Sequence, residues 1–379
     1  SIPRTTVGAQ ELILDLLKER SETGRIYIMN IDHCNSHSSF KDKVEMSNLC
    51  QEITLPTTPI SHIDDHLGEI ALCILSAVNV GKIRSDEELE ELCDLAVRGL
   101  EELIDYQDYP VLAAEQATKA RRSLGVGFIG LAHYLAKLGY DYGSQEAWDA
   151  VHGLSESFQY YLLKASNEVA KEKGWCENFG RTKYSDGILP IDTYKKDVDE
   201  ISSQELQHDW ESLRASILEH GLRHSTLSAQ MPSESSSVVC NATNGIEPPR
   251  DYLSVKKSKQ GPLKQIVPSY GSLKNQYTLL WDMPDNTGYI NVVAVMQKFF
   301  DQAISGNWSY NPEHYPDNEV PTTVMAQDFL TTYKYGWKTS YYQNTNDMKT
   351  DDMEEPNKLD TLLEELSTAN EEECESCAI

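Results

Sequence analysis

The sequence predicts an α/β fold, and the order of its elements favours a barrel. Residues 70–80 form a mostly apolar run, which is typical of a strand buried on both faces of a parallel sheet or barrel. Residues 86–106 carry leucines at helical spacing among acidic side chains, so we expect an amphipathic helix there. Strands that alternate with long helices along a chain are characteristic of the α/β class.

The remaining elements follow from the same periodicities. Residues 25–31 are rich in β-branched and aromatic side chains and follow Thr23-Gly24, which predicts a strand. Further strands are expected near residues 224–231, 250–255 and 277–283. Helices are expected over residues 145–172, 202–220 and 324–335, and the apolar side chains of the last one favour packing in the core.

Charge and hydropathy restrict the partners of this chain. Its 379 residues include 33 Lys or Arg and 60 Asp or Glu, which gives a net charge of −27. Nucleic acids and anionic membranes bind cationic surfaces, so we expect neither as a partner. The chain has no apolar run of the roughly 18 residues that a membrane span needs, so we expect neither a membrane span nor a signal peptide.

Cysteine usage indicates the compartment. The eight cysteines are spread along the chain, unlike the dense frameworks of small secreted domains. This distribution predicts a reducing cytoplasm and a few thiols that react. The first residue is Ser1 rather than Met, so we expect either a processed terminus or a cut through a longer protein.

Residues 345–379 differ in kind from the rest. They contain 12 Asp or Glu against 2 Lys and no aromatic residue, which predicts a flexible acidic tail after a folded part comprising residues 1–344. Cys374 and Cys377 form a CxxC motif near its end. A zinc site would need two further ligands, and none lies nearby in sequence, so we expect a redox dithiol and no bound metal.

Residues 47–53 form the motif with the clearest chemical content. Side chains two apart in an extended segment point the same way, so Asn48, Cys50 and Glu52 would converge in a strand or extended loop. Leu55-Pro56 and Pro59 downstream argue against a helix. A thiol beside an amide and a carboxylate is a catalytic arrangement; the alternative is a buried cysteine in a polar loop.

Two further motifs have ordinary structural alternatives. The serine-rich segment 232–237 follows an expected strand, and hydroxyls with free backbone N–H groups at a helix start can bind an anion, although such a segment is also a common turn. Residues 125–130 match GxGxxG. Because the residues before them favour a helix instead of a strand, we expect a packing role and no dinucleotide site.

Residues 48–52 also resemble the active-site loop of the large subunit of aerobic, class I ribonucleotide reductases. Further stretches resemble that family in the same order: residues 68–73, 231–236, 241–248 and 341–345, and the C-terminal cysteine pair. The resemblance covers nearly the whole chain but only the C-terminal half of the family's large subunit. It implies part of a ten-stranded α/β barrel, with Cys50 at the tip of a loop inside it.

The resemblance also implies roles for individual residues. Cys50 would form a thiyl radical that takes the 3′ hydrogen of the substrate ribose, Glu52 would remove the 3′-hydroxyl proton, and Asn48 would hydrogen-bond the substrate. Cys73, otherwise a plain core cysteine, would be one of two cysteines that oxidise to a disulfide, and its partner lies in the absent half. The expected substrate-binding residues are Asn48, Leu49, Cys50, Gln51, Glu52, Pro232, Ser233, Glu234, Ser235 and Ser236.

Tyr341 and Tyr342 match the pair that passes a radical from the partner subunit to the active-site cysteine; the alternative is two half-buried residues of a strand. Cys374 and Cys377 would reduce the internal disulfide and be reduced in turn by thioredoxin or glutaredoxin. In the family, a helix comparable to residues 324–335 helps to form the groove for the small subunit's C-terminal tail.

The family implies conversion of ribonucleoside diphosphates to deoxyribonucleoside diphosphates for DNA replication, with no cofactor bound by this chain. The implied partners are a separate N-terminal half, a metal-containing small subunit that supplies the radical, and thioredoxin or glutaredoxin. Without the N-terminal half we expect no activity. One rival is a glycyl-radical enzyme, but no glycine follows Gly336. A second is a non-catalytic remnant that binds and modulates a reductase subunit.

Overall fold

A computed structural model describes residues 4–258 and 261–346 of the chain. The helices are α1 (Ala9–Thr23), α2 (Ile31–Ser36), α3 (Asp86–Tyr106), α4 (Leu112–Arg121), α5 (Leu131–Leu138), α6 (Gln145–Lys173), α7 (Pro190–Thr193), α8 (Trp210–His220), α9 (Glu234–Val239), α10 (Tyr270–Leu273), α11 (Thr287–Gln297) and α12 (Thr322–Lys334). The strands are β1 (Ile28–Met29), β2 (Ile74–Asn79), β3 (Leu124–Ile129), β4 (Leu253–Ser258), β5 (Gly261–Ile266), β6 (Trp308–Tyr310), β7 (Thr339–Ser340) and β8 (Gln343–Thr345).

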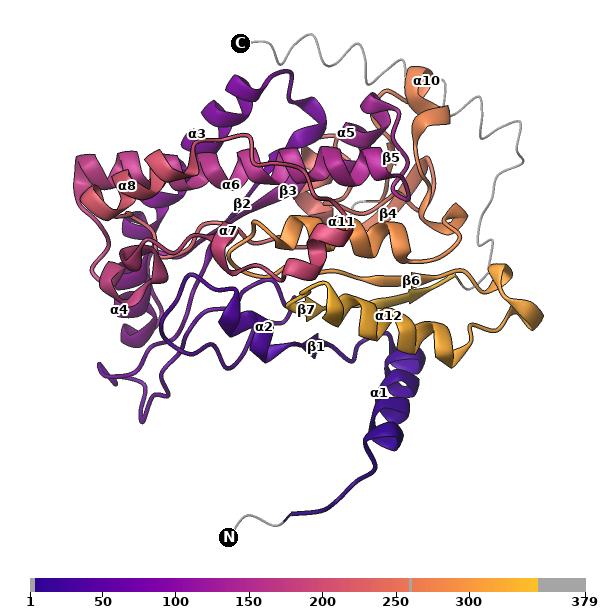
Figure 1. Cartoon of the computed structure of the whole chain (residues 1–379), viewed down its shortest axis with the longest axis horizontal. Helices are drawn as coiled ribbons and strands as arrows, with labels where there is room; N and C mark the ends of the chain where they lie inside the picture. The colour runs from indigo at the N-terminus through magenta and orange to yellow at the C-terminus, as the bar shows by residue number, and fades with distance from the viewer. Residues whose placement is uncertain (1–3, 259–260, 347–379) are drawn as a thin grey trace.

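Long helices cover one side of the strands (Figure 1). The 29-residue α6 runs across the molecule and packs against α3, α8 and α11. In the same view α12 and α1 lie on the opposite side, and α1 projects from the body toward the N-terminus. Among the described helices, none combines the length and apolar character needed to cross a membrane.

In the described part of the chain, the strands and extended segments lie side by side in a row that does not close on itself. β2 pairs in parallel with β3, and single bridges continue the parallel order from Val126 to Ser228 and from Gln230 to Ile304. The amide of Tyr341 then donates to Gly306 O at 2.7 Å, and β7 pairs antiparallel with β1. Over residues 4–258 and 261–346 the sheets are two-stranded and none closes on itself, so the structure does not confirm the ten-stranded barrel of which this chain is expected to form a part.

The core lies between the strands and α6. The rings of Phe128 in β3 and Phe158 in α6 meet edge to face with centroids 4.6 Å apart, and Phe300, just after α11, stacks on Phe158 at 5.8 Å. These three side chains are fully buried. Aromatic contacts of this kind add to the free energy gained by burying apolar surface. They fix β3, and the extended segments beside it, against the helical layer.

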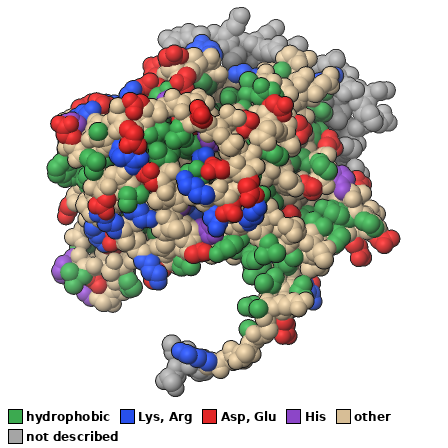
Figure 2. Space-filling model, viewed as in Figure 1, with side chains coloured by type: hydrophobic (Ala, Val, Ile, Leu, Met, Phe, Trp, Pro, Cys, Tyr) green, Lys and Arg blue, Asp and Glu red, His purple; other side chains and the backbone are tan. Residues whose placement is uncertain are grey.

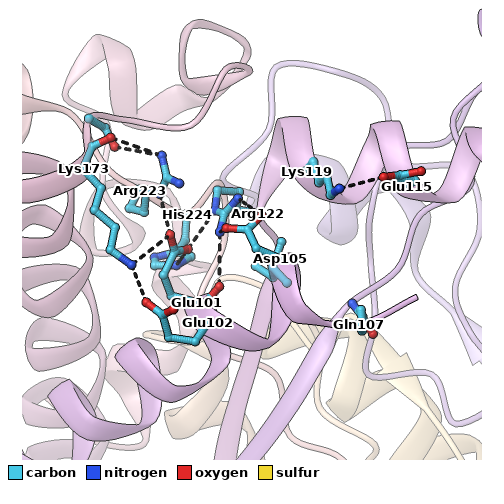
Figure 3. Close-up of polar contacts among 12 residues, drawn as sticks. Glu101, Glu102, Asp105, Gln107, Glu115, Lys119, Arg122, Lys173, Arg223 and His224 are labelled. Carbon is cyan, nitrogen blue, oxygen red and sulfur yellow. Dashed lines mark hydrogen bonds and ion pairs between the residues drawn. The ribbon is translucent and has the colours of Figure 1, made fainter. Parts of the chain in front are cut away.

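A buried ion cluster ties α3 to the start of β3 (Figure 3). The carboxylate of Glu101, only 1 % exposed, accepts from Arg122 Nε at 2.7 Å, Arg223 Nε at 2.7 Å and His224 Nε2 at 2.9 Å. Burial alone would raise the pKa of Glu101, but the hydrogen bonds from His224, Arg122 and Arg223 hold the pKa well below its usual range. The cluster is thus a fixed structural contact, because the carboxylate stays ionised.

Most predicted elements are present, with shifted ends. The helix predicted over residues 86–106 is α3, whose start is capped by Ser85, and residues 145–172 and 324–335 correspond to α6 and α12. The strands expected near residues 70–80 and 250–255 correspond to β2 and β4. Residues 25–31 contribute only the two residues of β1, because α2 begins at Ile31.

Other predictions were wrong in part or in full. Residues 202–209 are not helical; α8 begins at Trp210, where the side chain of Asp209 caps the helix by accepting from Ser212 N at 3.0 Å. Residues 277–283 do not form a strand, since a 3-10 turn spans Leu280–Asp282. Residues 224–231 are extended but make only single bridges, at Ser228 and Gln230.

The glycines of the GxGxxG match confirm the packing interpretation. Gly125 and Gly127 lie inside β3, and a Cβ atom at Gly127 would come within 2.6 Å of the carbonyl oxygen of Ala229. A Cβ atom at Gly125 would meet a side-chain carbon of Leu75 at 2.6 Å. Both glycines therefore allow the neighbouring extended segments to approach β3 closely.

Candidate active site

Cys50 lies in a tight turn and not in an extended segment. The amide of Gln51 donates to the carbonyl oxygen of Asn48 at 3.2 Å, and Gln51 adopts a left-handed φ of 71°. The Oδ1 atom of Asn48 accepts from Ile53 N at 3.1 Å, which closes the turn from its other end. The predicted extended conformation was therefore wrong. At the tip of the turn, the side chain of Leu49 is 76 % exposed.

The turn nevertheless brings Asn48 and Glu52 together, because it folds the chain back on itself. Glu52 is 2 % exposed, and its backbone carbonyl accepts from Ala303 N at 3.0 Å. Its carboxylate accepts from the hydroxyl of Ser305 at 3.2 Å. Burial raises the pKa of Glu52, against the opposing hydrogen bonds from the Asn48 side chain, the backbone and Ser305. A buried carboxyl with a raised pKa is suited to accept and release a proton.

Tyr341 contacts the thiol directly. Its hydroxyl lies 3.4 Å from the Sγ atom of Cys50, and its ring centroid is 4.0 Å from that of Tyr342. The two tyrosines occupy the short connection between β7 and β8, so they are not strand residues facing opposite sides. Burial, and then the contacts with Cys50 and Tyr342, raise the pKa of Tyr341 far above its usual value. The phenol therefore keeps its proton at neutral pH.

Two residues that the sequence analysis did not single out organise this pair. The ring of Tyr27, which precedes β1, lies 4.8 Å from Tyr341 and 5.6 Å from Tyr342. Arg20 in α1 is fully buried and donates to the carbonyls of Tyr341 at 2.8 Å and Tyr342 at 3.1 Å. An aromatic residue in an expected strand and an arginine in a helix carry no local signal of this role.

Cys73 immediately precedes β2 and lies close to the same carboxylate. Its Sγ accepts from the side-chain amide of Gln302 at 3.4 Å. Burial raises the pKa of the Cys73 thiol to about 12; the Gln302 hydrogen bond acts against this rise and the charge of Glu52 adds to it. The oxygen of the Gln302 amide accepts from Thr54 N, so one side chain joins Cys73 to the chain just after Glu52.

The serine-rich segment begins close to Ser305. The backbone amide of Ser305 donates to the carbonyl of Gln230, just before that segment, at 2.9 Å. Pro232 follows two residues later, and Ser233 precedes the six-residue α9. Ser233 is buried, and its hydroxyl donates to the carbonyl of Met231 at 3.2 Å. The other residues expected to bind the substrate here, Glu234, Ser235 and Ser236, are exposed at the start of α9.

The structure thus groups Asn48, Cys50, Glu52, Cys73 and the tyrosine pair around residues 302–305. Cys374 and Cys377 lie outside the described residues, as does almost all of the expected tail.

Comparison with known protein families shows which family the chain belongs to. The model of the ribonucleotide reductase barrel domain matches residues 1–277 and 270–343. The chain belongs to this family. It is 57 % identical over 350 residues to the ribonucleoside-diphosphate reductase subunit alpha of Haemophilus influenzae. The aligned residues make up 92 % of this chain and 46 % of that protein.

Two other reductase alpha subunits are also similar to this chain over nearly its whole length. The ribonucleoside-diphosphate reductase 1 subunit alpha of Escherichia coli is 55 % identical over 350 residues, which is 92 % of this chain and 46 % of that subunit. The subunit alpha of Enterobacteria phage T4 is 40 % identical over 387 residues, covering 100 % of this chain and 49 % of the phage protein. The chain therefore spans about half the length of the reductase subunits that it matches.

Proposed function

We propose that this chain is the C-terminal part of a ribonucleotide reductase large subunit and that it reduces ribonucleoside diphosphates by thiyl-radical chemistry. The observation that carries the proposal is the contact of the Tyr341 hydroxyl with Cys50 Sγ at 3.4 Å, beside a buried carboxyl. A phenol packed against a second phenol and in contact with a thiol provides a path for coupled transfer of an electron and a proton.

The first chemical steps use the Cys50 turn. The Cys50 thiyl radical takes the 3′ hydrogen of the ribose and becomes a thiol, which leaves a carbon radical on the sugar. Glu52 accepts the 3′-hydroxyl proton, and the 2′ hydroxyl takes a proton from one thiol of the cysteine pair that includes Cys73 and leaves as water. Asn48 hydrogen-bonds the substrate. The buried position of Glu52 and its raised pKa support its role as general base.

The next steps supply two electrons. Cys73 and a second cysteine, provided by the N-terminal half, are oxidised to a disulfide while the sugar is reduced. The 3′ hydrogen returns from Cys50, so the thiyl radical is regenerated. The dithiol of Cys374 and Cys377 reduces the internal disulfide by exchange, and thioredoxin or glutaredoxin reduces that dithiol. A flexible segment of about 30 residues has a root-mean-square reach of roughly 30 Å, which suits such a shuttle.

Substrate and partners follow from the same proposal. Residues 232–236 bind the diphosphate of the nucleotide, and the N-terminal half completes a ten-stranded barrel around the Cys50 turn. The metal-containing small subunit supplies the radical and docks its tail beside α12. Figure 2 shows hydrophobic side chains gathered near α1 and α12, and Leu12 and Leu330 are 56 % and 58 % exposed, which supports docking there. We place the assembly in the cytoplasm.

Reconstitution tests this function. The chain, a separately expressed N-terminal half from a reductase large subunit, and a small subunit are mixed with a ribonucleoside diphosphate and reduced thioredoxin. We expect turnover in the complete mixture and none when the N-terminal half is omitted. Cys50→Ser abolishes turnover, whereas Cys240→Ser, at an exposed thiol, does not. A complete mixture that is equally active with Cys50→Ser would exclude the catalytic assignment, and an inactive but assembled complex would favour the non-catalytic remnant.

A further inference from the structure

We propose that Ser305 is a positioning residue that couples the charge of Glu52 to the backbone of the Cys50 turn. Its importance for turnover rests on the proposed function, because both partners belong to the proposed site. The coupling itself is a property of the folded chain.

Ser305 contacts both groups with one hydroxyl. Its Oγ lies 2.5 Å from the carbonyl oxygen of Cys50 and 3.2 Å from Oε2 of Glu52. The residue is 8 % exposed, and its backbone amide is held by the carbonyl of Gln230 at 2.9 Å. The hydroxyl is therefore fixed between the two acceptors while its hydrogen remains free to rotate.

The single hydroxyl hydrogen of Ser305 allows two hydrogen-bond arrangements. A carbonyl oxygen can only accept, and a serine hydroxyl has one hydrogen to donate. When Glu52 is protonated, its carboxyl group donates to Ser305, and Ser305 donates to the Cys50 carbonyl. When Glu52 is ionised, the hydroxyl turns toward the carboxylate, because a hydrogen bond to a charged group is the stronger one. The Cys50 carbonyl then loses its donor. No covalent bond changes apart from the proton that Glu52 takes up or releases.

The turn is placed to respond to this change. The Cys50 carbonyl belongs to the peptide group that leads into Gln51, whose φ of 71° is unusual for a residue with a side chain. The rest of the turn is closed by the Asn48 contacts, which do not involve the Cys50 carbonyl. If Glu52 takes a proton from the substrate, the Ser305 hydroxyl returns to the Cys50 carbonyl and secures the turn while the radical is on the sugar.

Other titratable groups face this site from two elements. The Cys73 thiol, just before β2, interacts with Glu52, and Tyr341, just after β7, contacts Cys50. Burial raises the pKa of Cys73 to about 12 and raises that of Tyr341 as well. Both groups stay neutral over the acidic and neutral range in which a carboxyl titrates. A change at the Cys50 carbonyl in that range can therefore be assigned to Glu52 by mutating it.

The sequence offers a selective probe. Cys50-Gln51 is the one place where cysteine precedes glutamine in the 379 residues. Labelling the full chain with carbonyl-¹³C cysteine and ¹⁵N glutamine gives a single NMR signal that connects the Cys50 carbonyl to the Gln51 amide. We expect the Cys50 carbonyl shift to follow one titration as pH is raised and to move to lower frequency as the hydrogen bond is lost.

Four variants separate the explanations. Glu52→Gln should make the signal independent of pH, Ser305→Ala should remove the titration of the Cys50 carbonyl, and Ser305→Thr should keep it because the hydroxyl is retained. Ser123→Ala, at a buried serine that contacts Ser225, serves as the matched control and should titrate like the wild type.

A full titration in Ser305→Ala, or a flat response in the wild type, would overturn the coupling. If Ser305→Ala does not fold, the wild type, Ser305→Thr and Glu52→Gln still test the coupling. A Cys50 carbonyl shift that does not titrate in Ser305→Thr would overturn it. A titration that persists in Glu52→Gln would also overturn it. The measurement needs no turnover, so an inactive reconstituted enzyme leaves its outcome unchanged.

Discussion

Arg20 and Tyr341 are joined across almost the whole chain: the guanidinium of Arg20 donates from Nη1 to the carbonyl of Tyr341 at 2.8 Å, over a separation of 321 residues. The same guanidinium donates to the carbonyls of Tyr342 and Ile26 and lies 4.4 Å above the ring of Trp308. Burial lowers the pKa of Arg20 to about 10, so it remains a cation at neutral pH. One buried cation thus anchors α1 to the tyrosine pair.

Removing this cation should be costly. Arg20→Ala removes a donor from the carbonyls of Ile26, Tyr341 and Tyr342, of which the last still accepts from Trp308 N. It also opens a cavity beside Trp308, so we expect a loss of about 3 kcal/mol in the free energy of unfolding. Urea denaturation followed by tryptophan fluorescence measures it. Lys18→Ala, on the same helix with a side chain that is 74 % exposed, is the control and should change stability little. Equal effects of the two substitutions would contradict the anchoring role.

Tyr27 should tune the acidity of its neighbour. Hydrogen bonds from Tyr341 and then from Tyr27 lower the pKa of Tyr342. Tyr27→Phe removes one of these donors while keeping the ring, so the pKa of Tyr342 should rise. Fluorotyrosine placed at position 342 allows this titration to be followed by ¹⁹F NMR. Tyr106→Phe, at a residue that is 87 % exposed, should leave it unchanged. An unchanged Tyr342 titration in Tyr27→Phe would show that the two rings touch without sharing a hydrogen bond.

Acid should destabilise the chain through the Glu101 cluster. The folded-state pKa of Glu101 lies below its ordinary value of 4.5, so its contribution is complete above that value and is lost as pH falls toward the folded pKa. Burial lowers the pKa of His224 below 6.5, against the opposing contact with Glu101, so the unfolded chain takes up this proton at a higher pH than the folded chain does. Both groups therefore make stability decrease as the pH falls.

Glu101→Gln tests this assignment by urea denaturation at several pH values. Glu101→Gln removes the carboxylate that contacts Arg223 and leaves Asp105 as the acidic partner of the buried Arg122. We therefore expect a loss of about 3 kcal/mol at neutral pH and a weaker dependence on pH below the ordinary carboxyl value of 4.5. The neighbouring Glu102→Gln removes an exposed contact with Lys173 and should have little effect. A pH dependence in Glu101→Gln as steep as in the wild type would assign acid sensitivity to other groups.

Local patterns in the sequence predicted local structure well and distant contacts poorly. The start of α3 follows from Ser85 as its cap and its length from the spacing of its leucines, so both could be predicted. The convergence of Asn48 and Glu52 was predicted from a strand periodicity, whereas a turn closed by the Asn48 side chain produces it. Arg20 contacts the tyrosine pair, and Ser305 contacts Cys50 and Glu52, across more than 250 residues of chain, which no local pattern reveals.

Gln302 should control the reactivity of Cys73. Its side-chain amide donates to the Cys73 sulfur at 3.4 Å, and a donor favours the thiolate over the thiol. Gln302→Met removes this donor while keeping a side chain of similar length. The pKa of Cys73, about 12 in the wild type, should rise further, so alkylation of Cys73 by iodoacetamide at alkaline pH should become slower.

Mass spectrometry of the labelled peptides gives the alkylation rate of each cysteine in one sample. Cys176, which is buried away from Gln302, is the internal control, since it reports any general loosening of the fold. We expect the ratio of the Cys73 rate to the Cys176 rate to fall in Gln302→Met. A ratio that stays constant or rises would mean that access, and not the hydrogen bond from Gln302, governs how fast the Cys73 thiol reacts.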